Sequence, residues 1–146
     1  MTKDFYNSLA PYYKYIYFDW DKSVENQAKS LDSIIKEFFS GKKTLLDASC
    51  GIGTQSIGLA ELGYEVSASD LSDEEVKLAK QEADKRKLKI DFQVADMREV
   101  SKAFNKKFDI VISADNSVPH LLTDEDILKT FKEFYKLSNL ESKSKH

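Results

Sequence analysis

Four short apolar segments, each with an acidic residue within two residues of its carboxyl end, constrain the fold of this chain more than any other feature. The apolar segments are 44–48, 64–69, 90–95 and 108–113. Helical patterns occupy 23–39, 54–62, 72–85 and 123–137. Strands that alternate with helices are typical of a parallel, doubly wound α/β sheet, because each helix returns the chain across one face. We therefore expect this fold class.

The predicted helices carry start and stop signals. Ser23 is the expected N-cap of the first helix, and Gly41 lies where that helix would stop. Ser72 and Glu75 have the spacing of a capping box, and Thr123 is expected to open the last helix. Apolar spacing of three or four predicts one stripe on the first helix, made of Val24, Ala28, Leu31, Ile35 and Phe38.

Acidic residues gather at one edge of the predicted sheet. Asp47, Asp70 and Asp96 close the first three strands, and the pair Asp115–Asn116 follows the fourth. The carboxyl ends of parallel strands meet at the same edge, and ligands of doubly wound sheets bind there beside the first strand. The sequence therefore predicts a ligand site at this edge.

The loop after the first strand has the composition of a ligand cradle. Gly51 and Gly53 have no Cβ, so the backbone can turn sharply and approach a ligand closely. The loop leads into the helix from Thr54, whose N-terminus favours a carboxylate or phosphate. A tight strand-to-helix turn would use the same residues. The position after the first strand of an α/β pattern favours the functional interpretation.

Two of the acidic residues suit a nucleoside. Asp70 lies 17 residues after Gly53, at the end of the next strand, where a carboxylate can bind two ribose hydroxyls. The alternative is an N-terminal charge for the following helix, a role that Ser72 and Asp73 already fill. Asp96 could accept a hydrogen bond from the exocyclic amine of adenine, with a turn-forming aspartate as an equal alternative.

Composition excludes several classes of partner. The 146 residues include 22 basic and 25 acidic ones, a net charge of −3, which gives no reason to expect nucleic acid or an anionic membrane. The single cysteine, Cys50, rules out an internal disulfide and a multi-cysteine zinc site. The sequence has no signal peptide pattern and no apolar run near the ~18 residues of a membrane span. We expect a cytoplasmic protein without a metal.

Four motifs, in this order along the chain, resemble the class I S-adenosylmethionine-dependent methyltransferases. Leu-Leu-Asp-Ala-Ser-Cys-Gly-Ile-Gly-Thr at 45–54 is similar to the family's acid followed by a Gly-x-Gly loop. The other three are Ser-Asp-Leu-Ser at 69–72, Ala-Asp-Met-Arg at 95–98 and Phe-Asp-Ile-Val-Ile at 108–112. The resemblance implies a Rossmann-like sheet in strand order 3-2-1-4. It also implies S-adenosylmethionine as cofactor, S-adenosylhomocysteine as product and a small-molecule substrate.

The resemblance assigns the methionine end of the cofactor to the glycine loop. The backbone around Ser49, Gly51 and Gly53 would hold the methionine moiety. Asp47 would support the loop and the amino group, which the Ala114 carbonyl would also help to hold.

At the adenosine end, the same resemblance assigns the ribose hydroxyls to Asp70, with Leu71 packing beside the base. Asp96 and the amide of Met97 would bind the adenine edge. Cys50 needs no chemical role, because a small apolar residue suits this loop.

The run Ala-Asp-Asn-Ser-Val-Pro-His-Leu at 114–121 resembles the Gly-Asn-Ser-x-x-His-Leu segment of glycine and sarcosine N-methyltransferases. The resemblance makes Asn116 the first substrate-side residue and His120 the second. His120 as a general base is one interpretation, and a structural histidine beside a helix is the other.

The aromatic N-terminus is similar to the lid of the same family. The run 5–13 would close over the cofactor, with Tyr13 and Tyr17 as candidates to touch the substrate. Simple packing of an amphipathic lid is the alternative for most of these aromatic residues. We expect a lid and helix at 1–40, an incomplete cofactor-binding domain at 41–140 and a polar tail at 141–146.

The sequence departs from the family in its strand number. The usual fold has seven strands and this chain shows four, so we expect a fragment, a truncated gene product or a unit that needs a partner. The uncovered edge of the fourth strand would offer a route to a homo-oligomer. We also expect weaker cofactor binding than in a full-length relative.

Two other functions fit the same pattern. A nicotinamide-dependent oxidoreductase would have a third glycine in its loop, where this chain has Ser56. A non-catalytic module that keeps only the cofactor pocket would fit the small number of strands.

Overall fold

The structure is a computed structural model that describes residues 3–12, 19–114 and 123–139. Its elements are α1 (Lys3–Leu9), η1 (Ala10–Tyr12), α3 (Trp20–Phe38), β1 (Thr44–Asp47), α4 (Thr54–Glu61), β2 (Glu65–Asp70), α5 (Asp73–Lys85), β3 (Asp91–Val94), η2 (Met97–Lys102), β4 (Ile110–Ile112) and α6 (Asp124–Leu137). Within the described ranges, no helix combines the length and the hydrophobicity that a membrane crossing requires.

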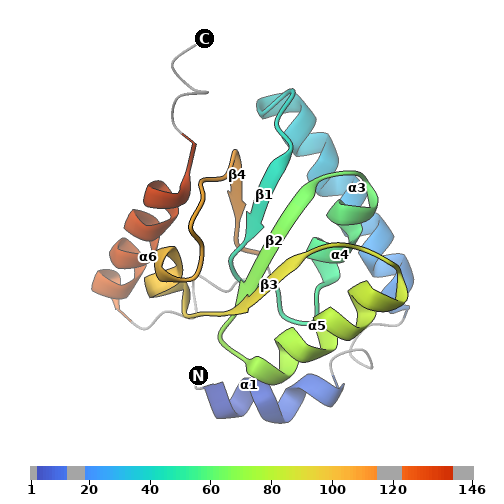
Figure 1. Ribbon diagram of the computed structural model, residues 1–146, viewed down its shortest axis with the longest axis horizontal. Helices are drawn as coiled ribbons and strands as arrows, with labels where there is room; N and C mark the ends of the chain where they lie inside the picture. Colours follow the sequence, from blue (N-terminus) through green and yellow to red (C-terminus); the bar gives the residue numbers. More distant parts are fainter. Residues whose placement is uncertain (1–2, 13–18, 115–122, 140–146) are drawn as a thin grey trace.

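The four strands form one parallel sheet in the order β3-β2-β1-β4, which confirms the expected fold. β1 is central, with Leu45 opposite Val66 of β2 and Ile110 of β4. β2 continues beyond β1, and its last residue, Asp70, pairs with Val94 of β3. The carboxyl ends of the strands therefore meet at one edge, the lower edge in Figure 1.

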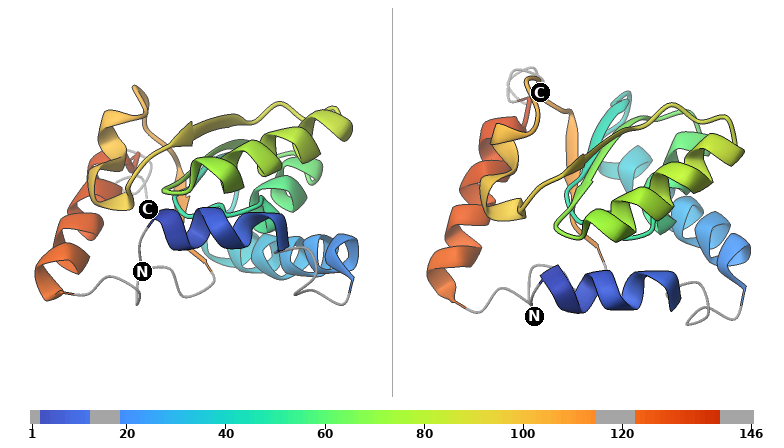
Figure 2. Two further views of the ribbon diagram at one scale, coloured as in Figure 1. Left: turned by 90° about the horizontal axis from the view of Figure 1, so that it is seen from below. Right: turned by 60° about the horizontal axis from the view of Figure 1, so that its bottom comes forward.

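Helices cover both faces of the sheet, with α3, α4 and α5 on one face and η2 with α6 on the other (Figures 1 and 2). The core under α3 and α4 is made of Ile35, Leu45, Leu59, Val66 and Ile110. The core under η2 and α6 is made of Leu46, Ala48, Val100, Phe104, Phe108 and Leu137. Successive residues of a strand point to opposite faces, so Leu45 and Leu46 belong to different cores. This two-sided burial explains why β1 has no polar alternation.

The helix predicted over 23–39 begins earlier, at Trp20, and the prediction of Ser23 as its N-cap is wrong. Asp19 is the N-cap, because its extended backbone lets its carboxylate accept a backbone N–H three residues later at 3.1 Å. Trp20 is buried, and its indole N–H donates to the Thr54 hydroxyl at 3.1 Å. The start of α3 is therefore fixed by the Asp19 cap and by the hydrogen bond between Trp20 and α4, neither of which aliphatic spacing could reveal.

The capping box predicted for α5 is half formed. The Ser72 hydroxyl accepts a hydrogen bond from the Glu75 N–H at 3.2 Å, as expected for an N-cap. The reciprocal bond, from the Ser72 N–H to the Glu75 side chain, does not form, because the Ser72 N–H donates to Asp70 Oδ1 at 3.0 Å. The Glu75 carboxyl is therefore available for contacts elsewhere. The cap predicted at Thr123 is confirmed by a bond from the Asp126 N–H at 3.0 Å.

The fourth strand is shorter than the predicted range 108–113. Phe108 pairs instead with the chain that follows α6, in a parallel bridge with Ser138. Its N–H donates to the Leu137 carbonyl, and its carbonyl accepts from the Asn139 N–H, both at 2.7 Å. Phe108 is therefore bonded on the side away from β1, whereas the N–H of the next residue, Asp109, donates to the Thr44 hydroxyl of β1 at 2.9 Å.

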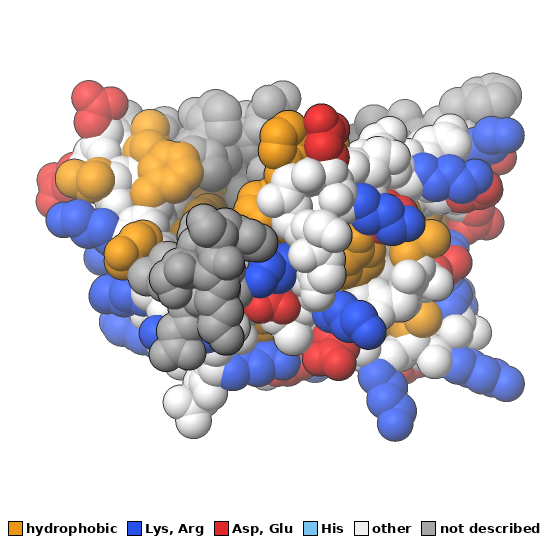
Figure 3. All heavy atoms as spheres, turned by 90° about the horizontal axis from the view of Figure 1, so that it is seen from above, with side chains coloured by type: hydrophobic (Ala, Val, Ile, Leu, Met, Phe, Trp, Pro, Cys, Tyr) orange, Lys and Arg blue, Asp and Glu red, His pale blue; other side chains and the backbone are white. Residues whose placement is uncertain are grey.

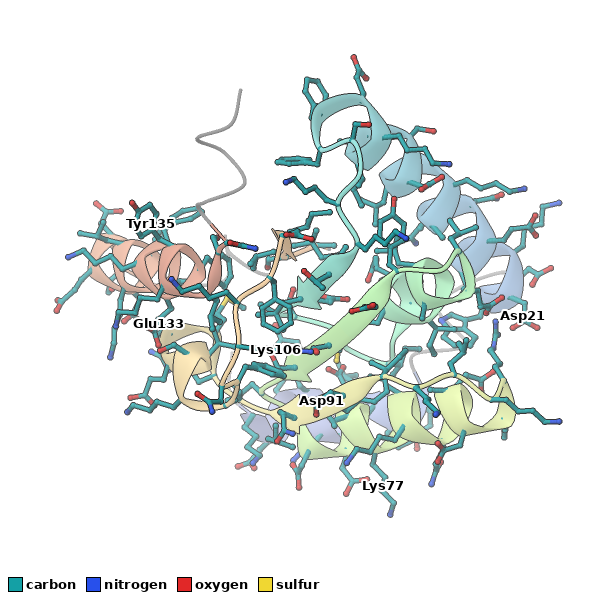
Figure 4. The ribbon with its side chains drawn as sticks, turned by 45° about the horizontal axis from the view of Figure 1, so that its top comes forward. Asp21, Lys77, Asp91, Lys106, Glu133 and Tyr135 are labelled. Carbon is teal, nitrogen blue, oxygen red and sulfur yellow. The ribbon has the colours of Figure 1, made fainter. Side chains whose placement is uncertain are left out.

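Apolar residues of the two longest helices are not all buried. Phe38, which was expected on the buried stripe of α3, is 68% exposed, so that part of the prediction is wrong. On α6, three large apolar side chains are more than half exposed, namely Leu128, Phe131 and Tyr135. Its buried residues are Thr130, Glu133 and Leu137. Glu133 and Tyr135 point to different sides of α6 in Figure 4. Hydrophobic side chains gather at the upper left of Figure 3.

Gly58→Ala is expected to destabilise the protein, although alanine is the better helix former. A Cβ at Gly58 would lie 2.6 Å from the Ala28 Cβ and 2.7 Å from the Val24 carbonyl oxygen of α3. Overpacking costs about 1–3 kcal/mol, whereas the gain in helix propensity is about 1 kcal/mol. Because a backbone atom is among the clashing ones, we expect a lower Tm in thermal unfolding followed by circular dichroism. A raised Tm would contradict this prediction, because it would mean that α3 and α4 can move apart to accommodate the added Cβ without a loss of stability.

Candidate functional site

The glycine loop lies at the carboxyl edge, between β1 and α4. Backbone bonds fix it to both neighbouring strands: the Ala48 N–H donates to the Ile112 carbonyl and the Cys50 N–H to the Ser69 carbonyl, each at 2.9 Å. Gly51 and Gly53 have positive φ values of 53° and 93°, which favour glycine. At Gly53 a Cβ would also lie 2.8 Å from the Cδ1 of Ile57. The loop is therefore a rigid turn that brings the backbone to the edge without side chains.

Asp47 supports this loop from below. Its carboxylate is fully buried and accepts bonds from the Ser49 N–H at 3.3 Å and the Ser56 hydroxyl at 2.7 Å. Ser49 in turn shares a 2.9 Å hydrogen bond with Ser113, the residue that follows β4. Ser56, which stands where a nicotinamide-binding loop would have its third glycine, is thus bound to the buried acid of β1.

Asp70 connects the glycine loop to the start of α5. Its Oδ2 accepts the Gly51 N–H at 2.9 Å, and its Oδ1 accepts the Ser72 N–H at 3.0 Å. The side chain is only partly buried, so it is reachable from the edge of the sheet. Leu71, the expected neighbour of the base, is partly buried beside it. A carboxylate held by two backbone donors is a preorganised acceptor for hydroxyl groups.

Glu75 lies beside Asp70 and is 3% exposed. Its Oε2 is 3.8 Å from the position that a Cβ on Gly51 would occupy. Burial raises the pKa of Glu75 to about 9, with further contributions from the charge of Asp70 and a hydrogen bond to it. The sequence suggested only a capping role for Glu75, so this contact was missed.

Helix α1 crosses the carboxyl edge next to α5 (Figure 2). Asn7 fastens it there: its amide donates to Asp73 at 2.8 Å, and its carbonyl oxygen accepts from the Ser72 hydroxyl. Burial, and then the charges of Asp70 and Glu75, raise the pKa of Tyr6. Tyr6 is therefore within electrostatic range of both carboxyls. Neither Asn7 nor Tyr6 was singled out from the sequence, although the lid pattern included them.

Asp96 follows β3 as expected, but its carboxylate is already engaged. It caps η2 by accepting the Arg98 N–H at 2.9 Å, and it pairs with the Arg98 guanidinium at 2.6 Å. The hydrogen bond from the Arg98 side chain is the main reason that the pKa of Asp96 is lowered. An adenine amine at this position would share the acceptor with Arg98. Met97 is partly buried at the start of η2.

Cys50 is a buried member of the core under α5. Burial, followed by the charge of Asp47, raises the pKa of its thiol well above the ordinary value. A thiol that stays protonated is a poor nucleophile, which agrees with a packing role.

The substrate-side residues expected from the sequence lie outside the described residues. These are Asn116, His120, Tyr13 and Tyr17. Ala114, the expected carbonyl partner of the amino group, is partly buried at the end of the described part of this segment. The structure therefore brings together the loop, Asp47 and Asp70, with Asp96 at the next strand end.

Comparison with known proteins supports the same family over most of the chain. The family model for a methyltransferase domain matches residues 45–139. A glycine/sarcosine N-methyltransferase of Aphanothece halophytica is 36% identical over 122 residues, which are 80% of this chain and 45% of that enzyme. The chain thus spans about half the length of the curated relatives it matches.

Solved structures share the fold. An S-adenosylmethionine-dependent methyltransferase from Clostridium acetobutylicum ATCC 824 superposes with a TM-score of 0.74 at 23% identity, covering 92% of this chain and 53% of that one. The magnesium protoporphyrin IX methyltransferase of Synechocystis PCC 6803 with bound S-adenosylmethionine superposes with a TM-score of 0.70 at 25% identity, covering 94% of this chain and 70% of that one. The family match displaces the nicotinamide-dependent alternative. The chain belongs to the methyltransferase-domain family, within the class I S-adenosylmethionine-dependent methyltransferases.

Proposed function

We propose that this chain binds S-adenosylmethionine at the carboxyl edge of its sheet and serves methyl transfer to a small amine such as glycine or sarcosine. The observation that carries the cofactor part is Asp70, whose carboxylate is held by the glycine loop on one side and the first turn of α5 on the other. This is the position from which a carboxylate binds ribose hydroxyls in doubly wound folds.

The residues at this edge fit the chemistry of the cofactor. The backbone at Gly51 and Gly53 approaches the edge without a Cβ, which leaves room for the methionine moiety. The buried carboxylate of Asp47 places negative charge beneath a ligand that carries an ammonium and a sulfonium. Asp96 offers an acceptor to the adenine amine, shared with Arg98.

When bound, the cofactor supplies an electrophilic methyl group whose leaving group is a neutral thioether. The task of the chain is then to hold the acceptor nitrogen in line with the methyl group, because orientation accounts for most of such a rate enhancement. Asn116 and Tyr13 or Tyr17 are the residues that we assign to holding the acceptor. An amine must arrive deprotonated, and His120 is our candidate to accept that proton. Helix α1, fastened by Asn7, would limit access of water to the edge.

The acceptor is inferred from two observations. The glycine/sarcosine N-methyltransferase of Aphanothece halophytica is among the relatives of this chain. The run 114–121 resembles the corresponding segment of that class. A non-catalytic cofactor-binding module is the second candidate, because the glycine loop, Asp47 and Asp70 would serve cofactor binding alone equally well.

Asp70→Asn is expected to weaken binding of S-adenosylhomocysteine by about tenfold or more, measured by isothermal titration calorimetry at pH 7. The reason is that hydrogen bonds to a charged acceptor contribute about 1.5–3 kcal/mol. The matched control is Asp91→Asn, which removes an exposed carboxylate from β3 (Figure 4). Equal affinity in both variants, or binding of NAD⁺ in place of S-adenosylhomocysteine, would refute the proposed cofactor site.

Asn116→Ala is expected to lower the rate of glycine methylation by about tenfold while the affinity for S-adenosylhomocysteine stays within twofold. The loss of one oriented hydrogen bond to the acceptor sets this magnitude. Mass spectrometry of the products with glycine, sarcosine and a phenol as acceptors is the measurement. Tight binding of S-adenosylhomocysteine without methylation of any amine would favour the non-catalytic module instead.

A further inference from the structure

Glu75 is the least expected charged residue at the carboxyl edge. It lies in the first turn of α5, where its backbone N–H completes the cap made by Ser72. Its side chain, 3% exposed, is turned inward against the glycine loop rather than back to the cap. Its carboxyl group faces that of Asp70, close enough for a hydrogen bond between the two.

A hydrogen bond between two carboxyl groups requires one proton. Burial is the main cause that raises the pKa of Glu75 to about 9, followed by the negative charge of Asp70. Glu75 is the more deeply enclosed of the two, whereas Asp70 has two backbone N–H donors that stabilise its charge. At neutral pH the shared proton therefore resides on Glu75.

We propose that Glu75 is a positioning residue for the ribose-binding carboxylate: its neutral carboxyl donates a hydrogen bond that fixes Asp70 in the orientation required by the cofactor. This inference rests on the proposed function of Asp70. Glu75 itself is not assigned any contact with the cofactor.

Three donors then hold Asp70, from three parts of the chain. They are the Gly51 N–H of the loop, the Ser72 N–H at the cap of α5 and the hydroxyl of Glu75. Hydrogen bonds to a charged acceptor are short and directional, so together they restrict rotation of the carboxylate. A side chain that is already oriented loses less conformational entropy when the ligand binds. Removal of the Glu75 donor should therefore weaken binding without removing a ligand contact.

Ionisation of Glu75 would reverse this effect, because two negative charges would then face each other. The titratable groups close to Glu75 are Asp70 of β2, Cys50 of the glycine loop and Tyr6 of α1. The pKa values of Cys50 and Tyr6 are both raised, so these groups lose their protons at higher pH than their ordinary values. Near pH 9, therefore, the ionisation of Glu75 is the titration expected to replace its hydrogen bond to Asp70 by charge repulsion.

Affinity for S-adenosylhomocysteine, measured by calorimetry at pH 7, tests the hydrogen bond. Glu75→Leu removes the donor and should raise Kd about tenfold. Glu75→Gln keeps a neutral donor of the same shape and should restore Kd to within about twofold of the original chain. Glu74→Leu, which removes an exposed carboxyl from the adjacent position of α5, is the matched control and should leave Kd unchanged.

The pH profile separates positioning from a purely structural role. We expect Kd of the original chain to rise at least fivefold relative to that of Glu75→Gln between pH 7 and pH 10. The amino group of S-adenosylhomocysteine titrates equally in both measurements, so it cancels in the ratio of the two Kd values. Circular dichroism at each pH is the control that checks that both proteins remain folded. A constant ratio across this range would overturn the proposal.

Thermal stability tests the protonation of Glu75 separately. Glu75 keeps its proton up to about pH 9 in the folded chain but only to its ordinary value of 4.5 when unfolded. The free energy of unfolding therefore falls as pH rises from 4.5 to 9, by linkage. Glu75→Gln lacks this loss, so its Tm advantage should be near zero at pH 4 and grow up to pH 9. An advantage that does not change with pH would contradict a neutral Glu75.

The two proposals fail in distinguishable ways. If the original chain does not bind S-adenosylhomocysteine at pH 7, the proposed function of the site is wrong. If it binds, and Glu75→Leu and Glu75→Gln bind equally well at both pH values, Asp70 does not depend on Glu75 and only this inference is wrong.

Discussion

The hydrogen bond from the Gly51 N–H to the Asp70 carboxylate is the contact on which the carboxyl edge depends. It joins the loop after β1 to the end of β2, two segments that are 19 residues apart in sequence. The loop itself has positive φ values at Gly51 and Gly53, which glycine adopts without strain. The same carboxylate accepts the Ser72 N–H and so sets where α5 begins. One acidic side chain therefore fixes the loop and the neighbouring helix relative to each other.

Much of this arrangement could be predicted from the sequence, because it depends on local patterns. The strands, the glycine loop and the caps at Ser72 and Thr123 follow from apolar runs and from short-range turn and cap chemistry, whereas the strand order was implied by the family resemblance. The cap at Asp19 was missed because Trp20, rather than an aliphatic residue, begins the buried face of α3. The N-terminal residues include many aromatic side chains without regular spacing, so the sequence does not show which of them are buried and which are exposed.

The side-chain contacts that could not be predicted from the sequence are those in which a hydrogen-bond donor has several possible acceptors. The Ser72 N–H could bond Glu75 or Asp70, and the choice of Asp70 is what turns Glu75 toward the loop. Likewise, Arg98 forms an ion pair with the carboxylate of Asp96, two residues away. The motif that predicted Asp96 as an acceptor for adenine did not indicate that Arg98 would compete for the same carboxylate. Asn7 reaches the cap of α5 across 65 residues of sequence. Each of these is a tertiary contact between short polar side chains, for which residue spacing carries no signal.

The indole of Trp20 bears on how this site can be observed. It is the single tryptophan of the chain, and it is buried and bonded to Thr54, the first residue after the glycine loop. The guanidinium of Arg86 lies over its ring at 5.4 Å, so the fluorophore also contacts the end of α5. A displacement of the loop or of α5 would change the polarity around one emitting group without interference from another tryptophan. The chain thus contains a built-in optical reporter for its own ligand site, and no label is needed to use it.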